Sequence, residues 1–171
     1  MINIKNTYII SSSFLFSEYA AKEILLKFWD NKLPVDPVKI ATTSSIFVYG
    51  RGGAGDVSYP YSGYYRRLNG APSIEYNVSE PPVRQRFTVA HELGHFALGH
   101  DDAPRDAGNF QSSRDHREQQ ANRFAAELLM PASLVTQYYH SGVIESLEEL
   151  AKIFGVSKDA IGYRLMNIGL L

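Results

Sequence analysis

Apolar side chains recur at helical spacing in residues 17–30. Ala21, Ile24, Leu25 and Phe28 occupy positions i, i+3, i+4 and i+7, which places them on one face of an α-helix. Ser17 stands where a helix N-cap is expected. The pattern predicts an amphipathic helix that buries one side.

Between residues 45 and 78 the pattern changes to short β-like runs. Strands are expected at 45–49, 64–68 and 73–78, where aromatic and β-branched residues are frequent. Asn69-Gly70 joins the last two runs and is typical of a two-residue hairpin turn. The run 50–63 contains five glycines and is therefore expected to be a loop or hairpin tip. It lacks the Gly-Lys-Ser/Thr of a phosphate-binding loop, so no nucleotide is assigned to it. A small antiparallel sheet of about three strands is therefore predicted.

Helical spacing returns in the rest of the chain. Pro37 can open a short helix through residue 41, and Pro81-Pro82 introduce a helix that continues to about residue 98. Residues 101–114 are polar and rich in turn formers, so a loop is expected there. Further helices are predicted at 115–131, 131–140, 146–154 and 157–168. Strands followed by helices indicate the α+β class, and 171 residues with 44% hydrophobic composition suit one main domain.

The C-terminal helices have the spacing of a helix-turn-helix. Small and aliphatic residues mark a tight crossing there: Leu150, Ala151, Gly155, Val156 and Ile161. We expect a main domain at 1–140 and a helical segment at 141–171 packed on it. That segment carries four acidic and three basic residues, and only Lys158, Arg164 and Tyr163 are available for DNA. Because phosphate contacts need clustered cations, direct DNA binding is not expected.

Composition limits the other classes of partner and ligand. Lys and Arg total 17 against 18 Asp and Glu, so no global charge attracts nucleic acid or an anionic membrane. The absence of cysteine leaves histidines and carboxylates as the ligands for a metal. No signal-peptide pattern and no run of roughly 20 apolar residues is present. A soluble cytoplasmic protein is expected.

His91, Glu92 and His95 form a His-Glu-x-x-His motif. On a helix the two imidazoles leave the same face one turn apart and can converge on one ion. Glu92 lies about 100° round the helix from His91 and is suited to reach a water on that ion as general base. Gly94 in mid-helix costs about 1 kcal/mol relative to Ala, which suggests that another backbone passes close to this turn.

A catalytic zinc site needs a third protein ligand. Glu118 falls on the apolar stripe of the helix predicted at 115–131, beside the small residues Ala121 and Ala125, whereas Glu127 lies at about 180° from it. A carboxylate on an apolar face needs a cation to offset its desolvation. We therefore predict Glu118 as the third ligand, with His116 and Asp102 as alternatives. The other downstream candidates are Asp101, Asp106 and Asp115.

Two segments together resemble the ImmA/IrrE-type metallopeptidases: RQRFTVAHELGHFALGH at 84–100 and EQQANRFAAELLMP at 118–131. The similarity extends from roughly residue 74 to the C-terminus. It implies a zincin-like metallopeptidase domain with Zn²⁺ on His91, His95 and Glu118, and with Glu92 as catalytic acid and base. It also implies limited proteolysis of a partner protein, a helix-turn-helix repressor of a mobile element or a stress response.

The leading hypothesis is therefore a zinc-dependent endopeptidase. Its oxyanion stabiliser is left open among a tyrosine of the 59–65 cluster, His100 and Arg86. The alternative is a non-catalytic, metal-binding regulator or interaction module that uses the C-terminal segment. Glu92 favours the enzyme, because a structural metal site does not need a carboxylate at that position.

Overall fold

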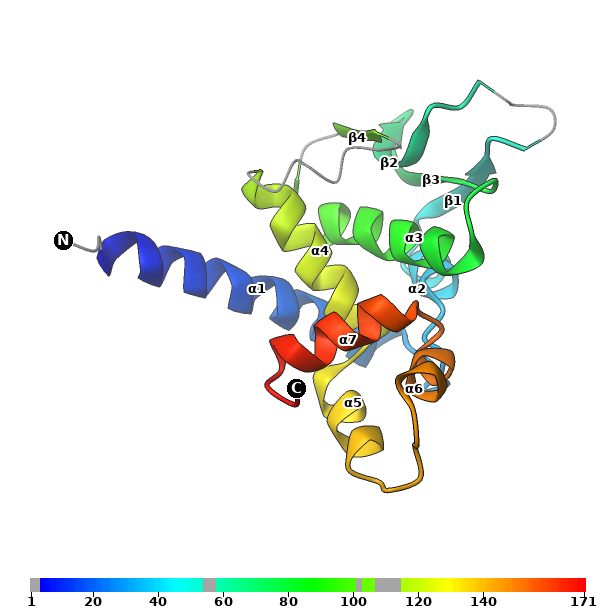
Figure 1. The fold of residues 1–171 in the computed structure, drawn as a ribbon. Coiled ribbons are helices and arrows are strands. Elements are labelled where there is room, and N and C mark those ends of the chain that lie inside the picture. The colour runs from blue at the N-terminus through cyan, green and yellow to red at the C-terminus, as the bar shows by residue number, and fades with distance from the viewer. Residues whose placement is uncertain (1–3, 54–57, 101–102, 107–114) are drawn as a thin grey trace.

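The computed structural model describes residues 4–53, 58–100, 103–106 and 115–171, and the statements below concern these residues. A four-stranded sheet lies above a central helix, α3, and the remaining helices lie beside and below it (Figure 1). The α+β class predicted from the sequence is confirmed.

Seven helices are present in the described part of the chain, and most follow the predicted bounds. They are α1 (Ile4–Phe28), α2 (Pro37–Thr43), α3 (Pro82–Ala97), α4 (His116–Leu129), α5 (Ala132–Tyr139), α6 (Leu147–Phe154) and α7 (Lys158–Asn167). Ser146 and Ser157 cap α6 and α7 through their hydroxyls, and Gly155 between them has φ 63°. The capping residues and the glycine therefore set these boundaries, as the sequence predicts.

Helix α1 is longer than its sequence pattern predicts. It begins at Ile4 and projects beyond the rest of the molecule (Figure 1). Ser17, expected as the N-cap, lies inside this helix and is fully buried, so that prediction is wrong. A serine in a helix interior destabilises the helix by only roughly a few tenths of a kcal/mol relative to alanine, so Ser17 alone does not force the helix to begin there. No helix in the described part of the chain is both long enough and apolar enough to span a membrane.

The predicted hairpin is present in the sheet. Strands β2 (Tyr61–Leu68) and β3 (Ala71–Asn77) pair antiparallel around Asn69 and Gly70. Both turn residues have positive φ, 51° and 83°, which is the conformation of a type I′ turn. The Asn-Gly signal thus fixes the register of the two strands that lie nearest to α3.

Two features of the sheet differ from the prediction. Strand β1 (Phe47–Arg51) pairs parallel to β3, so the sheet is mixed, with the order β1-β3-β2-β4. Local patterns cannot reveal this order, because it depends on which strands become neighbours in space. Strand β4 (Ala103–Asp106) lies within the predicted loop and pairs with β2 at the edge. Its four residues include Pro104, which an edge strand tolerates.

Helix α3 is enclosed over two turns. All residues from 88 to 95 are buried there: Thr88, Val89, Ala90, His91, Glu92, Leu93, Gly94 and His95. A Cβ added to Gly94 would lie 3.0 Å from Cδ1 of Phe124 on α4. The neighbour that Gly94 accommodates is therefore an aromatic side chain rather than the backbone that the sequence suggested.

The C-terminal helices are bound to the rest of the molecule by two arginines. Arg164 of α7 is buried, forms an ion pair with Glu127 of α4 and donates to the carbonyl of Met130 at 2.9 Å. Arg86 of α3 donates to the carbonyls of Val35 and Gly155. From the sequence, Arg164 is one of the few side chains available for DNA, and Glu127 lies about 180° from the buried stripe of its helix. Instead, α7 buries both side chains against each other.

The Arg164–Glu127 pair provides a stability prediction. Arg164→Met should lower the free energy of unfolding by about 3–5 kcal/mol, because it leaves Glu127 buried without its main partner. Denaturant unfolding measures this change. The double variant Arg164→Met/Glu127→Leu should recover part of the loss, and Lys158→Met, at an exposed ion pair on the same helix, should leave the midpoint unchanged. A single variant as stable as wild type would contradict the prediction.

Candidate metal centre

Three metal-capable side chains meet between α3 and α4. Nε2 of His91 lies 3.2 Å from Oε2 of Glu118, and Nε2 of His95 lies 3.2 Å from Oε1 of the same carboxylate. The two Nε2 atoms are 3.0 Å apart. In the described part of the chain, this is the group of histidines and carboxylates that could hold a metal ion. The structure thus brings together the three side chains predicted as ligands.

The geometry and charge of this group fit a divalent ion. A tetrahedral zinc ion with ligands at about 2.0–2.2 Å holds the ligand atoms roughly 3.3 Å apart, close to the separations found here. His91 is fully buried and Glu118 is about one-fifth exposed, so the carboxylate needs a nearby cation. The imidazoles of His91 and then His95 hold the pKa of Glu118 well below its usual range. The carboxylate is therefore ionised and able to act as a ligand.

Glu92 lies on the side of α3 that faces the sheet. Its Oε2 accepts a hydrogen bond of 2.9 Å from the backbone N–H of Tyr65 in β2, and the side chain is buried. This contact depends on Gly63, because a Cβ there would lie 2.3 Å from Cγ2 of Thr88 and 3.0 Å from Oε1 of Glu92. Gly63 thus lets β2 approach the turn of α3 that carries Glu92.

The ring nitrogens that face away from the candidate ion also have partners. Nδ1 of His91 lies 2.9 Å from Oδ1 of Asn122. Nδ1 of His95 lies 2.9 Å from Nδ1 of His100, whose Nε2 lies 3.1 Å from Oε1 of Gln120. Burial and the nearby His95 lower the pKa of His100. Both candidate ligand rings are therefore oriented by a hydrogen-bond partner at the nitrogen that faces away from the ion.

His100 owes its position to the end of α3. The N–H of Gly99 donates to the carbonyl of Phe96 at 3.2 Å, and the N–H of His100 donates to that of His95 at 2.9 Å. Gly99 has φ 68°. This pair of bonds around a left-handed residue is the Schellman motif. It returns the chain over the last turn of the helix, so His100 contacts His95 through both backbone and side chain.

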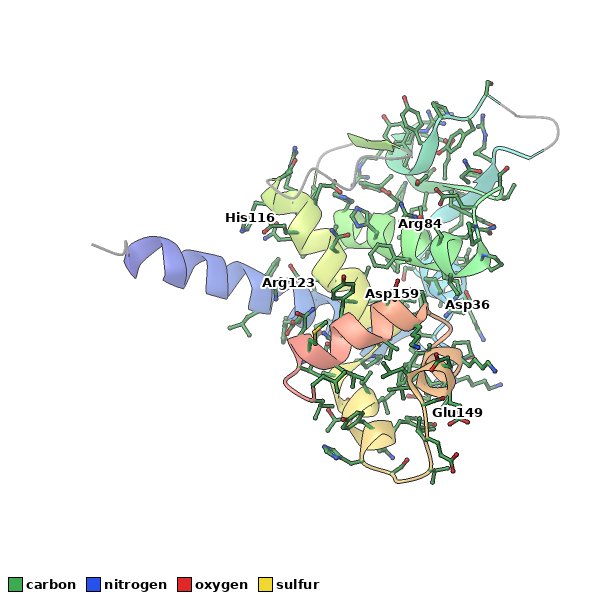
Figure 2. All side chains as sticks on the ribbon, in the orientation of Figure 1. Asp36, Arg84, His116, Arg123, Glu149 and Asp159 are labelled. Atoms are coloured by element: carbon green, nitrogen blue, oxygen red, sulfur yellow. The ribbon has the colours of Figure 1, made fainter. Side chains whose placement is uncertain are left out.

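Of the two alternative third ligands, only His116 lies in the described part of the chain, and it is not part of this group. His116 is exposed at the start of α4, where Figure 2 labels it. Asp101 and Asp102 lie outside the described residues. Asp115 caps α4 by accepting from the N–H of Arg117. Among the described carboxylates, Glu118 is thus the one placed beside both histidines.

Arg86, His100 and a tyrosine of the 59–65 cluster are the candidates for the oxyanion stabiliser, and they differ in which partners their side chains already have. Arg86 donates to the backbone carbonyls of Val35, just before α2, and of Gly155, between α6 and α7. His100 contacts His95 through the ring nitrogen that faces away from the candidate ion. Tyr59 remains a candidate from its cluster: burial, followed by the charges of Glu75 and Glu92, raises the pKa of its phenol well above the usual range. Its hydroxyl therefore stays protonated and able to donate.

A largely apolar cavity of about 570 Å³ lies between α3, α4 and α7, and its lining comes from the first turns of α3 and the last turns of α4 rather than from the candidate ligands. Arg84 on α3 and Asp159 on α7, both labelled in Figure 2, contribute to its lining. Phe87 also lines it, and the ring of Phe87 is centred 6.1 Å from that of His91. Phe87 lies one helical turn from His91, so the cavity adjoins α3 on the N-terminal side of the candidate ligands.

Sequence reasoning assigned no role to several residues around this centre. Asn122 falls on the same apolar stripe as Glu118, and a polar amide on a buried face is a signal that it needs a partner. Gln120 lies about 200° round α4 from Glu118, so helical periodicity alone gives no reason to connect it with the ligands. Gly63 is one of five glycines in its run, and nothing in the pattern distinguishes it from the others.

The chain matches the model of a known protein family. The model of the Peptidase_M78 family, described as the IrrE N-terminal-like domain, matches residues 56–166. The match begins before residue 74, where the resemblance was expected to start, and includes the candidate ligands, Glu92 and most of α7. No curated protein matches the chain.

The contact at Gly63 can be tested by adding one methyl group. Gly63→Ala should lower the free energy of unfolding by about 1–3 kcal/mol, because β2 must move away from Thr88 and Glu92. Gly162→Ala on α7 is the matched control, since a Cβ there meets nothing within 4 Å. It should be neutral or stabilising by up to about 1 kcal/mol. Equal unfolding midpoints for Gly63→Ala and wild type would show that the approach of β2 is not tight.

Proposed function

The chain belongs to the IrrE N-terminal-like peptidase family, and from this premise we propose that it is a zinc-dependent endopeptidase. The observation that carries the proposal is the convergence of His91, His95 and Glu118, with Glu92 on the same buried turn of α3 as the histidines. Two neutral imidazoles and one carboxylate are a ligand set of catalytic zinc sites, which keep one position open. Zinc held by these residues would lower the pKa of a bound water and polarise the scissile carbonyl.

Glu92 acts as the general base and then as the general acid. Its carboxylate takes a proton from the attacking water while the water oxygen bonds to the scissile carbonyl carbon. When the C–N bond breaks, Glu92 returns this proton to the nitrogen of the leaving amine. The backbone N–H of Tyr65 holds the side chain before the reaction.

The substrate is a protein, as the peptidase family implies, and we propose that cleavage is limited to a partner helix-turn-helix repressor. The support for the repressor is the resemblance of segments 84–100 and 118–131 to the ImmA/IrrE type. The alternative, a regulator that reads DNA through residues 146–168, loses Arg164 as a contact, because that side chain is buried.

Metal analysis tests the ligand set. The purified protein should contain about one zinc per chain, and His91→Ala, His95→Ala and Glu118→Ala should each reduce this content strongly, because two remaining ligands hold zinc poorly. Elemental analysis after exhaustive dialysis measures it, and His116→Ala serves as the control. Full zinc in both histidine variants would exclude the site. Zinc loss in His116→Ala but not in Glu118→Ala would instead make His116 the third ligand.

Glu92→Gln should keep the metal and abolish cleavage. Glutamine preserves the shape and the hydrogen bond from Tyr65 but cannot accept a proton, and loss of a general base costs about 10²–10⁴-fold in rate. The assay compares wild type and variant on the candidate repressor at matched zinc content and thermal stability. Equal cleavage by the two proteins would refute the role of Glu92. A zinc-loaded wild type that cleaves no repressor would favour the regulator.

A further inference from the structure

Three side chains of α4 within five residues contact the histidines of the candidate site through their oxygens. Glu118 contacts both candidate ligand nitrogens, Asn122 contacts the rear nitrogen of His91, and Gln120 contacts His100. Residues 118 and 122 lie on the same face of a helix, whereas residue 120 lies about 200° from residue 118. Asn122 can thus reach a ligand directly, but Gln120 reaches His95 only through an intermediate group.

We propose that His100 and Gln120 are positioning residues that hold His95 in the tautomer whose Nε2 faces the metal. The inference rests on the proposed metal-binding function, because it concerns how one ligand of that site is oriented. It adds a hydrogen-bonded chain from His95 through His100 to Gln120, in which neither of the last two residues touches the metal or the substrate.

The direction of the protons in this chain follows from its two ends. Nε2 of His95 must keep its lone pair for the ion, so the ring carries its proton on Nδ1. Nδ1 of His100, 2.9 Å away, then accepts this proton. A neutral imidazole with Nδ1 as acceptor carries its proton on Nε2, and that N–H donates to the amide oxygen of Gln120 at 3.1 Å. Each donor therefore meets one acceptor along the whole chain.

The backbone at the end of α3 places His100 beside His95. The Schellman motif at Gly99 bonds the N–H of His100 to the carbonyl of His95, so the same residue is fixed to His95 by its backbone and by its ring. His100 is partly buried, which limits competition from water for these hydrogen bonds. His100 thus connects His95, in the last turns of α3, to Gln120, which lies on the face of α4 opposite Glu118.

Zinc affinity of the full chain, measured by chelator competition, tests the proposal. Gln120→Met keeps the length of the side chain but removes the acceptor, and zinc should bind about 10–100-fold more weakly, as for other residues that orient a ligand. Gln120→Glu keeps an acceptor oxygen and should retain the wild-type affinity or exceed it. Gln137→Met, at an exposed glutamine of α5, is the matched control and should not change the affinity. Wild-type affinity in Gln120→Met, or equal weakening by Glu and Met, would overturn the proposal.

A second measurement needs no variant. In the zinc-loaded wild type, ¹⁵N-edited spectra of the imidazole rings should show His95 protonated on Nδ1 and His100 protonated on Nε2 alone. A proton on Nδ1 of His100 would break the chain and overturn the proposal, even if the variants fail to fold. Normal zinc binding without the His95–His100–Gln120 hydrogen bonds would refute only this inference. A wild type that binds no zinc would refute the proposed function as well.

Discussion

The packing of α4 against α3 is the contact on which the candidate site depends. Two histidines one turn apart supply half of a metal site, and the third ligand comes from a different helix. Gly94 lets the ring of Phe124 lie against the backbone of α3, so the helices approach closely beside His91 and His95. With a larger residue at 94, α4 would be displaced, and Glu118 would move away from both Nε2 atoms. The distances of 3.2 Å at the site are thus a consequence of core packing.

Enclosure of α3 determines the state of its polar side chains. Between the sheet and α4 there is little water to orient an imidazole or a carboxylate, so each polar atom depends on a protein partner. His91 has Asn122, His95 has His100, and Glu92 has the N–H of Tyr65. Such partners preorganise the group, since the side chains do not have to be ordered when an ion or a substrate arrives. Gly63 and Gly94 permit this enclosure on opposite sides of the helix.

Much of the architecture could be predicted because its causes are local. Helical spacing, the capping serines and the Asn69-Gly70 turn set the bounds of the C-terminal helices and the hairpin. The parallel pairing of β1 and the strand β4 could not be predicted, because they depend on contacts between distant segments. The same limit applies at the site. Helical periodicity selected Glu118. It placed Glu127 away from the buried stripe, because the pattern of α4 alone does not show that Arg164 of α7 covers this carboxylate. It also could not connect Gln120 to His95, because the link passes through His100, which lies outside α4.

The C-terminal helices contribute no candidate ligand, but they fix α3 and α4 relative to each other. The candidate ligands lie near the end of α3 and the beginning of α4, whereas the two arginine anchors act at the other end of this helix pair. Arg86 ties the first half of α3 to Gly155, and Arg164 ties the last turn of α4 to α7. Two helices that cross near their ligands can pivot about that crossing unless their far ends are fixed. Residues 147–167 fix those ends, so the helix-turn-helix-like segment stabilises the crossing angle on which the position of Glu118 depends.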